Sequence, residues 1–438
     1  MSTFADLRSA IETRRAQVGV IGMGYVGLPM LARAGNVGFN VLGFDISVER
    51  IASINNGVSY IGDVPSSDLA ALRNNNLIEA TAQFERLRDC DIIIICMPTP
   101  LNEARDPDMS YIEAATNEIA ERLRPGQLII LESTTYPGTT VEVLKPAFDA
   151  CNLTVGEDYF LAFSPERIDP GSVNFKVHNI PKVVGGVTPQ CNELTSLFYG
   201  HIVSAVTEVS SPAAAEMTKL FENIFRNVNI ALVNELTLIC DRMGLNVWEI
   251  IDAAATKPFG FMRFTPGPGL GGHCIPLDPF YLAWKARHYD ISARFIELAG
   301  EINLTMPRFV RDRISHALND QERSIKGSTI VLLGVAYKKD IDDYRESPIF
   351  KVMDLLAADG ANVYCCDPHV TVFYDHHNHE YQTVPLTDEL LQQAHCSVII
   401  TDHSAFDYAN IVAQSKVVVD TRNATREVKT HREKIRLL

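Results

Sequence analysis

The sequence lacks several features that mark secreted, metal-binding and membrane proteins. None of its nine cysteines forms a CxxC pair, and an odd number without secretory spacing indicates reduced thiols, as in the cytoplasm. The first residues contain neither a long apolar core nor a small-residue cleavage site, so we expect no signal peptide. No apolar run approaches the roughly 18 to 20 residues that a membrane helix needs. We therefore expect a cytoplasmic protein without a metal site or a membrane span.

Positive charge is also scarce. The chain has 39 Lys and Arg against 54 Asp and Glu, which gives a formal net charge of -15. This excess disfavours non-specific attraction to nucleic acid and to anionic membranes, so we expect neither as a partner. An anionic ligand must then be bound by individually placed cations. The 438 residues, 46% hydrophobic and 21% charged, suit an ordinary globular protein of two or three domains.

Strand and helix patterns alternate in two parts of the chain. Residues 17–45 predict a strand, a glycine turn, a helix and a second strand. Such alternation indicates a parallel, doubly wound sheet. After residue 320 the pattern returns without a glycine-rich turn, so a ligand there would be held differently. Further strands of the first part are predicted at 91–100, 127–135, 159–167 and 181–186.

A predicted helical segment separates these two parts. Residues 210–245 predict one long helix, with Ser210 or Ser211 as its cap, Pro212 near its first turn and Gly244 at its end. The helix is apolar on most sides, so we expect it to be buried between domains or subunits. The predicted fold is α/β, with two Rossmann-like doubly wound parallel-sheet domains joined by a central long-helix dimerisation domain. The predicted domains are residues 1–209, 210–320 and 321–438.

The glycine turn of the first part matches GxGxxG between a strand and a helix. The first glycine permits the tight turn, the second lets the backbone approach a pyrophosphate, and the third allows close helix–strand packing. Asp45 lies 18 residues past Gly27, where it can accept a hydrogen bond from a ribose 2′-hydroxyl and repel a 2′-phosphate. The turn therefore predicts NAD rather than NADP. Its residues are Gly22, Met23, Gly24, Tyr25, Val26 and Gly27.

The long helix carries a polar stripe. Lys219 and Asn223 lie four residues apart and share one face, which Glu216, Asn227 and Asn234 extend. A polar stripe is ordinarily the solvated side of a helix. Here the large apolar neighbours leave little room for a wet face, and a buried lysine is costly unless a partner or substrate needs it. We therefore interpret Lys219 and Asn223 as site residues.

Cys274 stands in the unusually bare segment "GPGLGGHCIPLDP", residues 267–279. One interpretation is a tight turn beside a buried cysteine, and the other is a nucleophile that must touch a substrate. A nearby lysine would favour the thiolate and hence the second. We do not expect His273 to act as its base, because adjacent side chains in extended backbone diverge. Asp278 is a better candidate for orienting a water or an attacking group.

Other candidates lie where predicted strands end. Glu166 and Arg167 in "SPERIDPGS", and Thr134 in "ESTTYPGTT", lie at carboxyl ends of strands, where open α/β sheets bind ligands. Lys338 and Arg345 flank "KKDIDDYR" after the first strand of the last part. That segment is either a solvated loop or a cationic clamp on phosphate.

Together these residues resemble the UDP-glucose/GDP-mannose dehydrogenase family. The resemblance runs over almost the whole chain, through "GMGYVGLP", "SPERIDPG", "EMTK", "GGHCIPLDP", "AYKKDIDDYRESP" and "VVVDTRN". It implies an N-terminal NAD domain, a central helical dimerisation domain and a C-terminal domain for the nucleotide of a UDP-sugar. It also implies oxidation of a sugar C6 alcohol to a carboxylate with two NAD⁺, and a homodimer or a higher homo-oligomer.

The resemblance also implies residue roles. Cys274 would attack the C6 aldehyde and form a thiohemiacetal and then a thioester, which Glu166 would help to hydrolyse as general base. Lys219 and Asn223 would stabilise the oxyanion, and Asp278 and Thr134 would hold a water. Lys338 and Arg345 would engage the phosphates and the region between substrate and cofactor. We expect further cofactor contacts from Arg50, Pro98, Thr99, Thr134 and Arg345, and substrate contacts from Glu166, Arg167, Lys219, Asn223, Phe264, Gly271 and Lys338.

One departure bears on the substrate. Members that act on UDP-glucose usually read NPEFLxEG around the glutamate, whereas Pro170 stands here in place of the second glutamate. "SPER" with "HCIPLDP" is more similar to members that oxidise UDP-N-acetylhexosamines for surface polysaccharides such as lipopolysaccharide. We expect UDP-N-acetylglucosamine, with UDP-glucose and UDP-N-acetylmannosamine as alternatives. A two-electron β-hydroxyacid dehydrogenase and a non-catalytic nucleotide-sugar sensor are more distant rivals.

Overall fold

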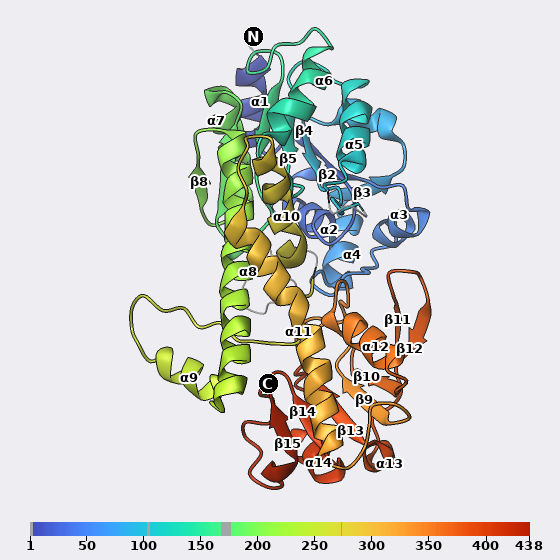
Figure 1. Ribbon diagram of the computed structural model, residues 1–438. Coiled ribbons are helices and arrows are strands. Elements are labelled where there is room, and N and C mark those ends of the chain that lie inside the picture. The colour runs from blue at the N-terminus through green and yellow to red at the C-terminus, as the bar shows by residue number, and fades with distance from the viewer. Residues whose placement is uncertain (1–2, 103–105, 168–176, 273) are drawn as a thin grey trace. The chain divides into compact units, whose positions relative to one another are not determined.

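The computed structural model describes residues 3–102, 106–167, 177–272 and 274–438 (Figure 1). His273 and Pro170 lie outside the described residues, as does the side chain of Cys274. The chain forms two compact units. The first comprises Met1–Glu222 and Phe280–Ile291, and the second comprises Asn223–Pro279 and Ser292–Leu438. No helix in the described part of the chain combines the length and the apolarity needed to cross a membrane.

The first unit is built on an eight-stranded sheet with the order β3-β2-β1-β4-β5-β6-β7-β8. All neighbours pair in parallel except β6 and β7, so the prediction of a wholly parallel sheet was wrong at this one place. A parallel pair needs a long crossover, usually helical. The described part of this connection holds only the short 3₁₀ turn Val177–Asn179. The strands are β1 Gln17–Ile21, β2 Asn40–Phe44, β3 Ile78–Thr81, β4 Ile92–Ile95, β5 Leu128–Leu131, β6 Phe160–Phe163, β7 Lys182–Gly186 and β8 Val206–Glu208.

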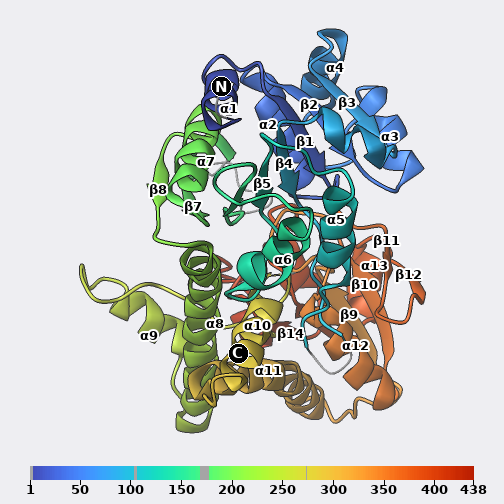
Figure 2. The ribbon, with the colours of Figure 1, turned by 90° about the horizontal axis from the view of Figure 1, so that it is seen from above.

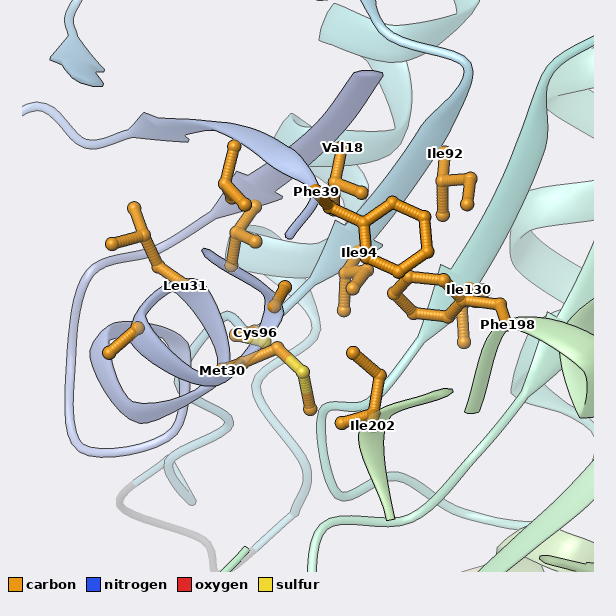
Figure 3. Packing of buried hydrophobic residues seen from close by; sticks show 14 of the residues in the cluster. Val18, Met30, Leu31, Phe39, Ile92, Ile94, Cys96, Ile130, Phe198 and Ile202 are labelled. Atoms are coloured by element: carbon orange, nitrogen blue, oxygen red, sulfur yellow. The ribbon is translucent and has the colours of Figure 1, made fainter. Parts of the chain in front are cut away.

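Both faces of this sheet are buried. Along β4, Ile92 and Ile94 join one apolar cluster, while Ile93 and Ile95 join another. Successive side chains of a strand point to opposite faces, so a continuous apolar run indicates cover on both sides. Figure 3 shows the first cluster, in which Phe39, Phe198 and Ile202 pack near these strands. The helices of the unit are α1 Thr3–Glu12, α2 Gly27–Asn36, α3 Val48–Asn55, α4 Ser66–Asn74, α5 Ser110–Ala120, α6 Lys145–Asp149 and α7 Pro189–Ile202.

The second unit holds a parallel five-stranded sheet with the order β10-β9-β13-β14-β15. The predicted return of the strand–helix alternation after residue 320 is therefore confirmed. The antiparallel hairpin of β11 and β12 was not predicted. The elements are β9 Thr329–Leu333, α12 Pro348–Ala358, β10 Asn362–Cys366, β11 Val372–Tyr374, β12 Glu380–Gln382, α13 Asp388–Gln393, β13 Cys396–Ile399, α14 Tyr408–Gln414, β14 Val418–Asp420 and β15 Ile435–Leu437.

The predicted long helix is α8, Pro212–Met243. Ser211 caps it, since its hydroxyl accepts from the Ala214 N–H at 3.2 Å, and Gly244 ends it with φ +69°. Its first residues belong to the first unit and the rest to the second. It is followed by α9 Val247–Ala254, α10 Cys274–Arg287 and α11 Arg294–Asn319. Figure 2 shows α9 and the loop after it extending away from α8.

One apolar stripe of α8 is exposed in the single chain, so for this stripe the expected burial between domains or subunits stays a prediction. Six large apolar side chains are exposed in the single chain, and at 100° per residue they fall within an arc of about 80°. The polar stripe with Lys219 and Asn223 lies on the other side and is buried. The polar side of the helix therefore faces the interior, where its side chains have hydrogen-bond partners. The exposed residues are Met217, Phe221, Phe225, Leu232, Ile239 and Met243.

Candidate active site

The β1–α2 turn leaves room for a ligand at its second glycine. A Cβ on Gly27 would lie 1.9 Å from the carbonyl oxygen of Gly22, and one on Gly22 would lie 2.6 Å from that of Cys96. Gly22 also has φ +92°. By contrast, no atom lies within 4 Å of a Cβ placed on Gly24. The outer glycines are thus required by packing and conformation, and the middle one leaves space where a pyrophosphate could approach the start of α2.

Asp45 ends β2 next to this turn and is almost fully buried. Its carboxylate accepts from the backbone N–H groups of Met23 and Ser47, each at 2.8 Å, and from the Arg50 guanidinium at 3.3 Å. A carboxylate offers about four lone-pair positions, so it can still accept from a ribose hydroxyl. Tyr60 adds a hydrogen bond to the carbonyl of Met23 at 2.6 Å. The residues present therefore fit NAD.

Two other predicted cofactor residues follow β4. Pro98 is exposed and Thr99 is buried, and the carbonyl oxygen of Thr99 accepts from the hydroxyl of Tyr281 at 2.7 Å. Tyr281 belongs to α10 and to the same unit, yet it lies far away in the sequence. No sequence signal pointed to this contact. Thr134, after β5, is half-buried, and Tyr25 is exposed in the glycine turn.

Glu166 belongs to a buried charge cluster that the sequence analysis missed. Lys182, the first residue of β7, places its ammonium 2.7 Å from Glu132 and 3.2 Å from Glu166. The hydroxyl of Tyr199 on α7 also donates to Glu132. Burial acts to lower the pKa of Lys182, but the two carboxylates outweigh it and raise this pKa, so the ammonium stays charged. The cluster is made of Glu132, Glu166, Lys182 and Tyr199. Its charged residues lie where β5 and β6 end and β7 begins.

Arg167 is held by partners within its own unit. Its guanidinium forms two hydrogen bonds to Glu222, at 2.6 and 3.2 Å, and a third to the carbonyl oxygen of Pro181 at 2.8 Å. Such a bidentate pair is a strong geometric constraint. A substrate that used this guanidinium would have to compete with Glu222.

The polar stripe of α8 is buried, as the sequence analysis expected. Lys219 and Asn223 are 8% and 5% exposed. The amide of Asn223 donates to the carboxylate of Asp278, which brings two predicted catalytic residues together. Glu216 instead has a local role, because it accepts from the N–H of Gly138 and from the N–H and hydroxyl of Thr140. It therefore anchors the turn that follows Thr134.

The bare backbone before Cys274 is explained by close packing. A Cβ on Gly271 would lie 2.5 Å from the Cβ of Tyr337, and one on Gly272 would lie 2.9 Å from the Tyr337 ring. A Cβ on Gly267 would lie 2.5 Å from the guanidinium of Arg422. The glycines thus let this segment lie against neighbouring groups of the second unit. Substrate access alone, which the sequence suggested as the reason, is not needed to account for them.

Buried amides fasten the same segment. Asn234 accepts from the N–H of Gly267 at 3.1 Å and donates to Asn303 at 2.9 Å. Asn227 donates to the carbonyl oxygen of Ile275, directly after Cys274, at 3.1 Å. These contacts position the backbone of the cysteine at the start of α10. Phe264, a predicted substrate residue, packs edge-on against Phe225 with ring centroids 5.8 Å apart.

A cationic pocket of about 300 Å³ opens at the carboxyl end of the second sheet. Arg422 lies two residues after the end of β14 and is half-buried, and desolvation lowers the pKa of its guanidinium. Sequence analysis missed this pocket and favoured Lys338 and Arg345, although Arg345 is paired with Asp343 at 2.7 Å. The missed signal was "VVVDTRN", an arginine at a strand end. The lining residues are Trp248, Arg263, Thr265, Lys339, Asp402, Tyr408, Arg422, Asn423, Ala424 and Arg426.

Asp367 occupies the place in the second sheet that Asp45 has in the first. Its carboxylate accepts from the backbone of Val335 and Ala336 at 2.6 and 3.0 Å and from the ring of His403 at 3.1 Å. Burial opposes ionisation, but these hydrogen bonds and those from residues 369 and 370 outweigh it and lower the pKa of Asp367 to about 2. Internal donors thus occupy this carboxylate.

Asp340, His369 and His403 bring possible metal-ligand atoms within 4.8 Å of one another. Both ring nitrogens of His403 are used, because Nδ1 accepts from the N–H of Asp340 and Nε2 contacts Asp367. Metal binding there would break these bonds, so the cluster has a structural explanation.

Three segments of the chain match known domains. Residues 16–203, 213–305 and 331–427 match the NAD binding, central and UDP binding domains of the UDP-glucose/GDP-mannose dehydrogenase family. A UDP-N-acetyl-D-mannosamine dehydrogenase of Pyrococcus horikoshii is 34% identical over 418 residues, which cover 94% of this chain and 96% of that protein. A UDP-N-acetyl-D-glucosamine 6-dehydrogenase of Pseudomonas aeruginosa is 35% identical over 372 residues, 84% of this chain and 86% of that protein.

The fold matches solved structures as well. The structure of the UDP-D-ManNAc dehydrogenase from Pyrococcus horikoshii has a TM-score of 0.87 and 32% identity, covering 96% of this chain and 98% of that chain.

Proposed function

Because the chain belongs to the UDP-glucose/GDP-mannose dehydrogenase family, we propose that it oxidises the C6 hydroxyl of a UDP-N-acetylhexosamine to a carboxylate. It is an NAD-dependent UDP-sugar dehydrogenase. UDP-N-acetylglucosamine is the proposed substrate, and the names of the relatives support an N-acetylated sugar. UDP-N-acetylmannosamine and UDP-glucose are the alternatives. The balanced reaction converts one alcohol, two NAD⁺ and one water into one carboxylate, two NADH and three protons.

The cofactor would lie on the glycine turn, with its pyrophosphate near Gly24 and a ribose near Asp45. Bound NAD⁺ accepts a hydride from C6 in each of the two oxidations. We propose further cofactor contacts from the other predicted residues of the first unit, Arg50, Pro98, Thr99 and Thr134. The cationic pocket of the second unit supports binding of the UDP moiety, because Lys339 and Arg422 supply the positive charge that a pyrophosphate needs and Trp248 supplies an apolar face.

The chemical steps use the chain's own side chains. Asp278 and Thr134 hold a water that takes the hydroxyl proton in the first oxidation. The thiolate of Cys274 then forms a bond to the aldehyde carbon, and Lys219 and Asn223 stabilise the resulting oxyanion. After the second oxidation C6 is a thioester. Glu166 accepts a proton from water, the water oxygen bonds to C6, and the C–S bond breaks to release the carboxylate and the thiol.

The observation that carries this proposal is the buried pair of Asn223 and Asp278. It joins Asn223 of α8 to Asp278 in the first turns of the helix that begins with Cys274, and both residues belong to the second unit. Packing alone does not explain a buried amide–carboxylate pair near a cysteine, because apolar residues would fill the same space at a lower free-energy cost. Chemistry at the cysteine gives these residues a reason to be there.

The test is a panel of UDP-sugars with purified protein, in which NADH and product are counted together. We expect two NADH per uronate, the highest kcat/KM with UDP-N-acetylglucosamine, and no uronate from Cys274→Ala. Cys151→Ser is the matched control, since that half-buried thiol donates to the backbone carbonyls of Ala120 and Ala147 in the first unit. Full conversion to uronate by Cys274→Ala would refute the thioester route. One NADH per sugar would instead indicate a two-electron dehydrogenase.

We also propose a homodimer formed through the exposed apolar stripe of α8. Phe221 is 65% exposed and Leu232 is 60% exposed in the single chain. An exposed apolar stripe of this length is typical of a protein interface. A three-domain division with borders after residues 209 and 320, a cytoplasmic location and a role in surface polysaccharide synthesis complete the proposal.

A further inference from the structure

Lys182 has three acceptors and almost no contact with solvent. Its side chain is 4% exposed, and its ammonium lies 2.7 Å from Glu132, 3.2 Å from Glu166 and 3.5 Å from the carbonyl oxygen of Pro165. An ammonium has three N–H donors, so all are used. Tyr199 completes the arrangement, because its ring centroid lies 4.9 Å from the ammonium while its hydroxyl donates to Glu132.

Burying such a charged cluster costs more free energy than filling the same volume with apolar side chains. Removing two ions from water costs more than packing apolar residues of similar size, so a buried ion pair is weak evidence for stability. The members also differ in exposure. The Glu132 side chain is fully buried, whereas the Glu166 side chain is 12% exposed and is the only one of the three charged groups that reaches the surface to that extent. The cluster therefore presents Glu166 outward and keeps the other charges inside.

Both oxygens of Glu166 are held. Oε2 meets the ammonium of Lys182, and Oε1 accepts from the backbone N–H of Arg167 at 2.6 Å. The backbone of Arg167 is itself fixed, because its guanidinium binds Glu222 and Pro181. The carboxylate thus has a defined orientation and a neighbouring positive charge.

We propose that Lys182 is a positioning residue that orients Glu166, and that Glu132 and Tyr199 hold the ammonium in place for this purpose. The proposal rests on the proposed role of Glu166 as the base in thioester hydrolysis. Glu132 has a second effect, since its negative charge offsets part of the pull of the ammonium on Glu166.

This arrangement predicts opposite responses to the loss of either charge. Among the described contacts of Glu166 is the ammonium of Lys182, with Glu132 and Tyr199 behind it and the thiol of Cys96 4.0 Å from Glu132. Lys182→Met removes the positive charge, so the acid limb of the kcat profile should move up by about one pH unit. Glu132→Gln removes the opposing negative charge, so the limb should move down. Mere loss of packing would not move the two limbs in opposite directions.

The experiment measures kcat, both KM values and the pH profile for Lys182→Met, Glu132→Gln, Glu166→Gln and the double variant Lys182→Met/Glu132→Gln. The double variant removes both of the fully buried charges and leaves only Glu166, which is partly exposed, so it tests the proposal even if Lys182→Met does not fold. We expect kcat of the double variant to fall about 10²-fold with both KM values within about twofold, and a covalent acyl-enzyme to accumulate in mass spectra. Lys285→Met is the matched control, because Lys285 pairs with Glu142 at 2.7 Å and lies 4.8 Å from the ring centroid of Tyr136 without contacting Glu166.

The outcomes separate the two proposals. If Glu166→Gln turns over like the wild type, the proposed role of Glu166 is wrong and the inference on Lys182 fails with it. If Glu166→Gln is impaired while the folded double variant keeps its kcat, or while the two single variants shift the acid limb in the same direction, only the inference on Lys182 is overturned. The same holds if Lys285→Met shifts the acid limb as much as Lys182→Met does.

Discussion

Replacing Gly24 by alanine should stabilise the protein and weaken NAD binding at the same time. The Gly24 backbone lies outside the left-handed region, and no atom lies within 4 Å of the added Cβ. Alanine therefore fits the native conformation and reduces the freedom of the unfolded chain, which raises the free energy of unfolding by about 0.4–1 kcal/mol. The new methyl group would nevertheless occupy the space through which the turn approaches a pyrophosphate. Stability and binding should move in opposite directions.

Gly27→Ala is the matched comparison. Its Cβ would lie 1.9 Å from the carbonyl oxygen of Gly22, a backbone atom that cannot rotate away. Overpacking of this kind costs about 1–3 kcal/mol or more, because the backbone or helix α2 must shift. This variant should lose both stability and NAD affinity.

Thermal unfolding and calorimetric titration with NAD⁺ check the pair. For domains of about 150–250 residues, 1 kcal/mol corresponds to about 2–4 °C in Tm, so Gly24→Ala should raise Tm by about 1–4 °C. Loss of a hydrogen bond to a charged phosphate weakens binding at least about tenfold. A lower Tm for Gly24→Ala would refute the structural argument. Wild-type NAD affinity in that variant would refute the assignment of the turn.

Three further predictions concern other parts of the chain. Asn234→Leu leaves the Gly267 N–H and the Asn303 side chain without their partner, so urea unfolding should show a loss of about 2–5 kcal/mol; a loss below 1 kcal/mol would contradict this. The hydrogen bonds lower the pKa of Asp367 to about 2, below its unfolded value near 4. The stabilisation of the folded state by this carboxylate is therefore fully present above about pH 4 and is lost as the pH falls towards 2. Asp367→Asn should therefore be less stable at pH 6 and show a shallower decline in acid, and parallel curves would count against the contact. Phe221→Glu should convert a dimer into monomers in sedimentation, whereas Tyr374→Glu, an exposed residue away from α8, should not.

Local patterns predicted most of the elements. The apolar run at β4 and the glycine turn before α2 depend on neighbours in the chain, and both were found where expected. The bounds of α8 followed from Pro212 and Gly244, which act on the backbone within one turn. The short strand β3 was missed because its four residues, IEAT, carry little apolar signal.

The position of β7 illustrates the limit of such patterns. Its residues predict a strand correctly, but they do not state its direction. Direction depends on how the connection crosses the sheet, and the antiparallel pairing of β6 and β7 brings Lys182 towards the end of the strand that precedes Glu166. The residues around Lys182 do not indicate that it will lie next to Glu166.

The amino-acid sequence alone thus determined the order of the elements, the NAD turn and the candidates Cys274, Lys219 and Asn223, because each rests on spacing within a short stretch. Only the tertiary structure decided that Glu132, Lys182 and Tyr199 share one buried cluster, and that Asn234 reaches Gly267. The hydrogen-bonded pairs Glu132–Lys182, Glu132–Tyr199 and Asn234–Gly267 lie 50, 67 and 33 residues apart. Whether a buried charge or amide finds a partner depends on strand order and helix packing, and no local propensity encodes either.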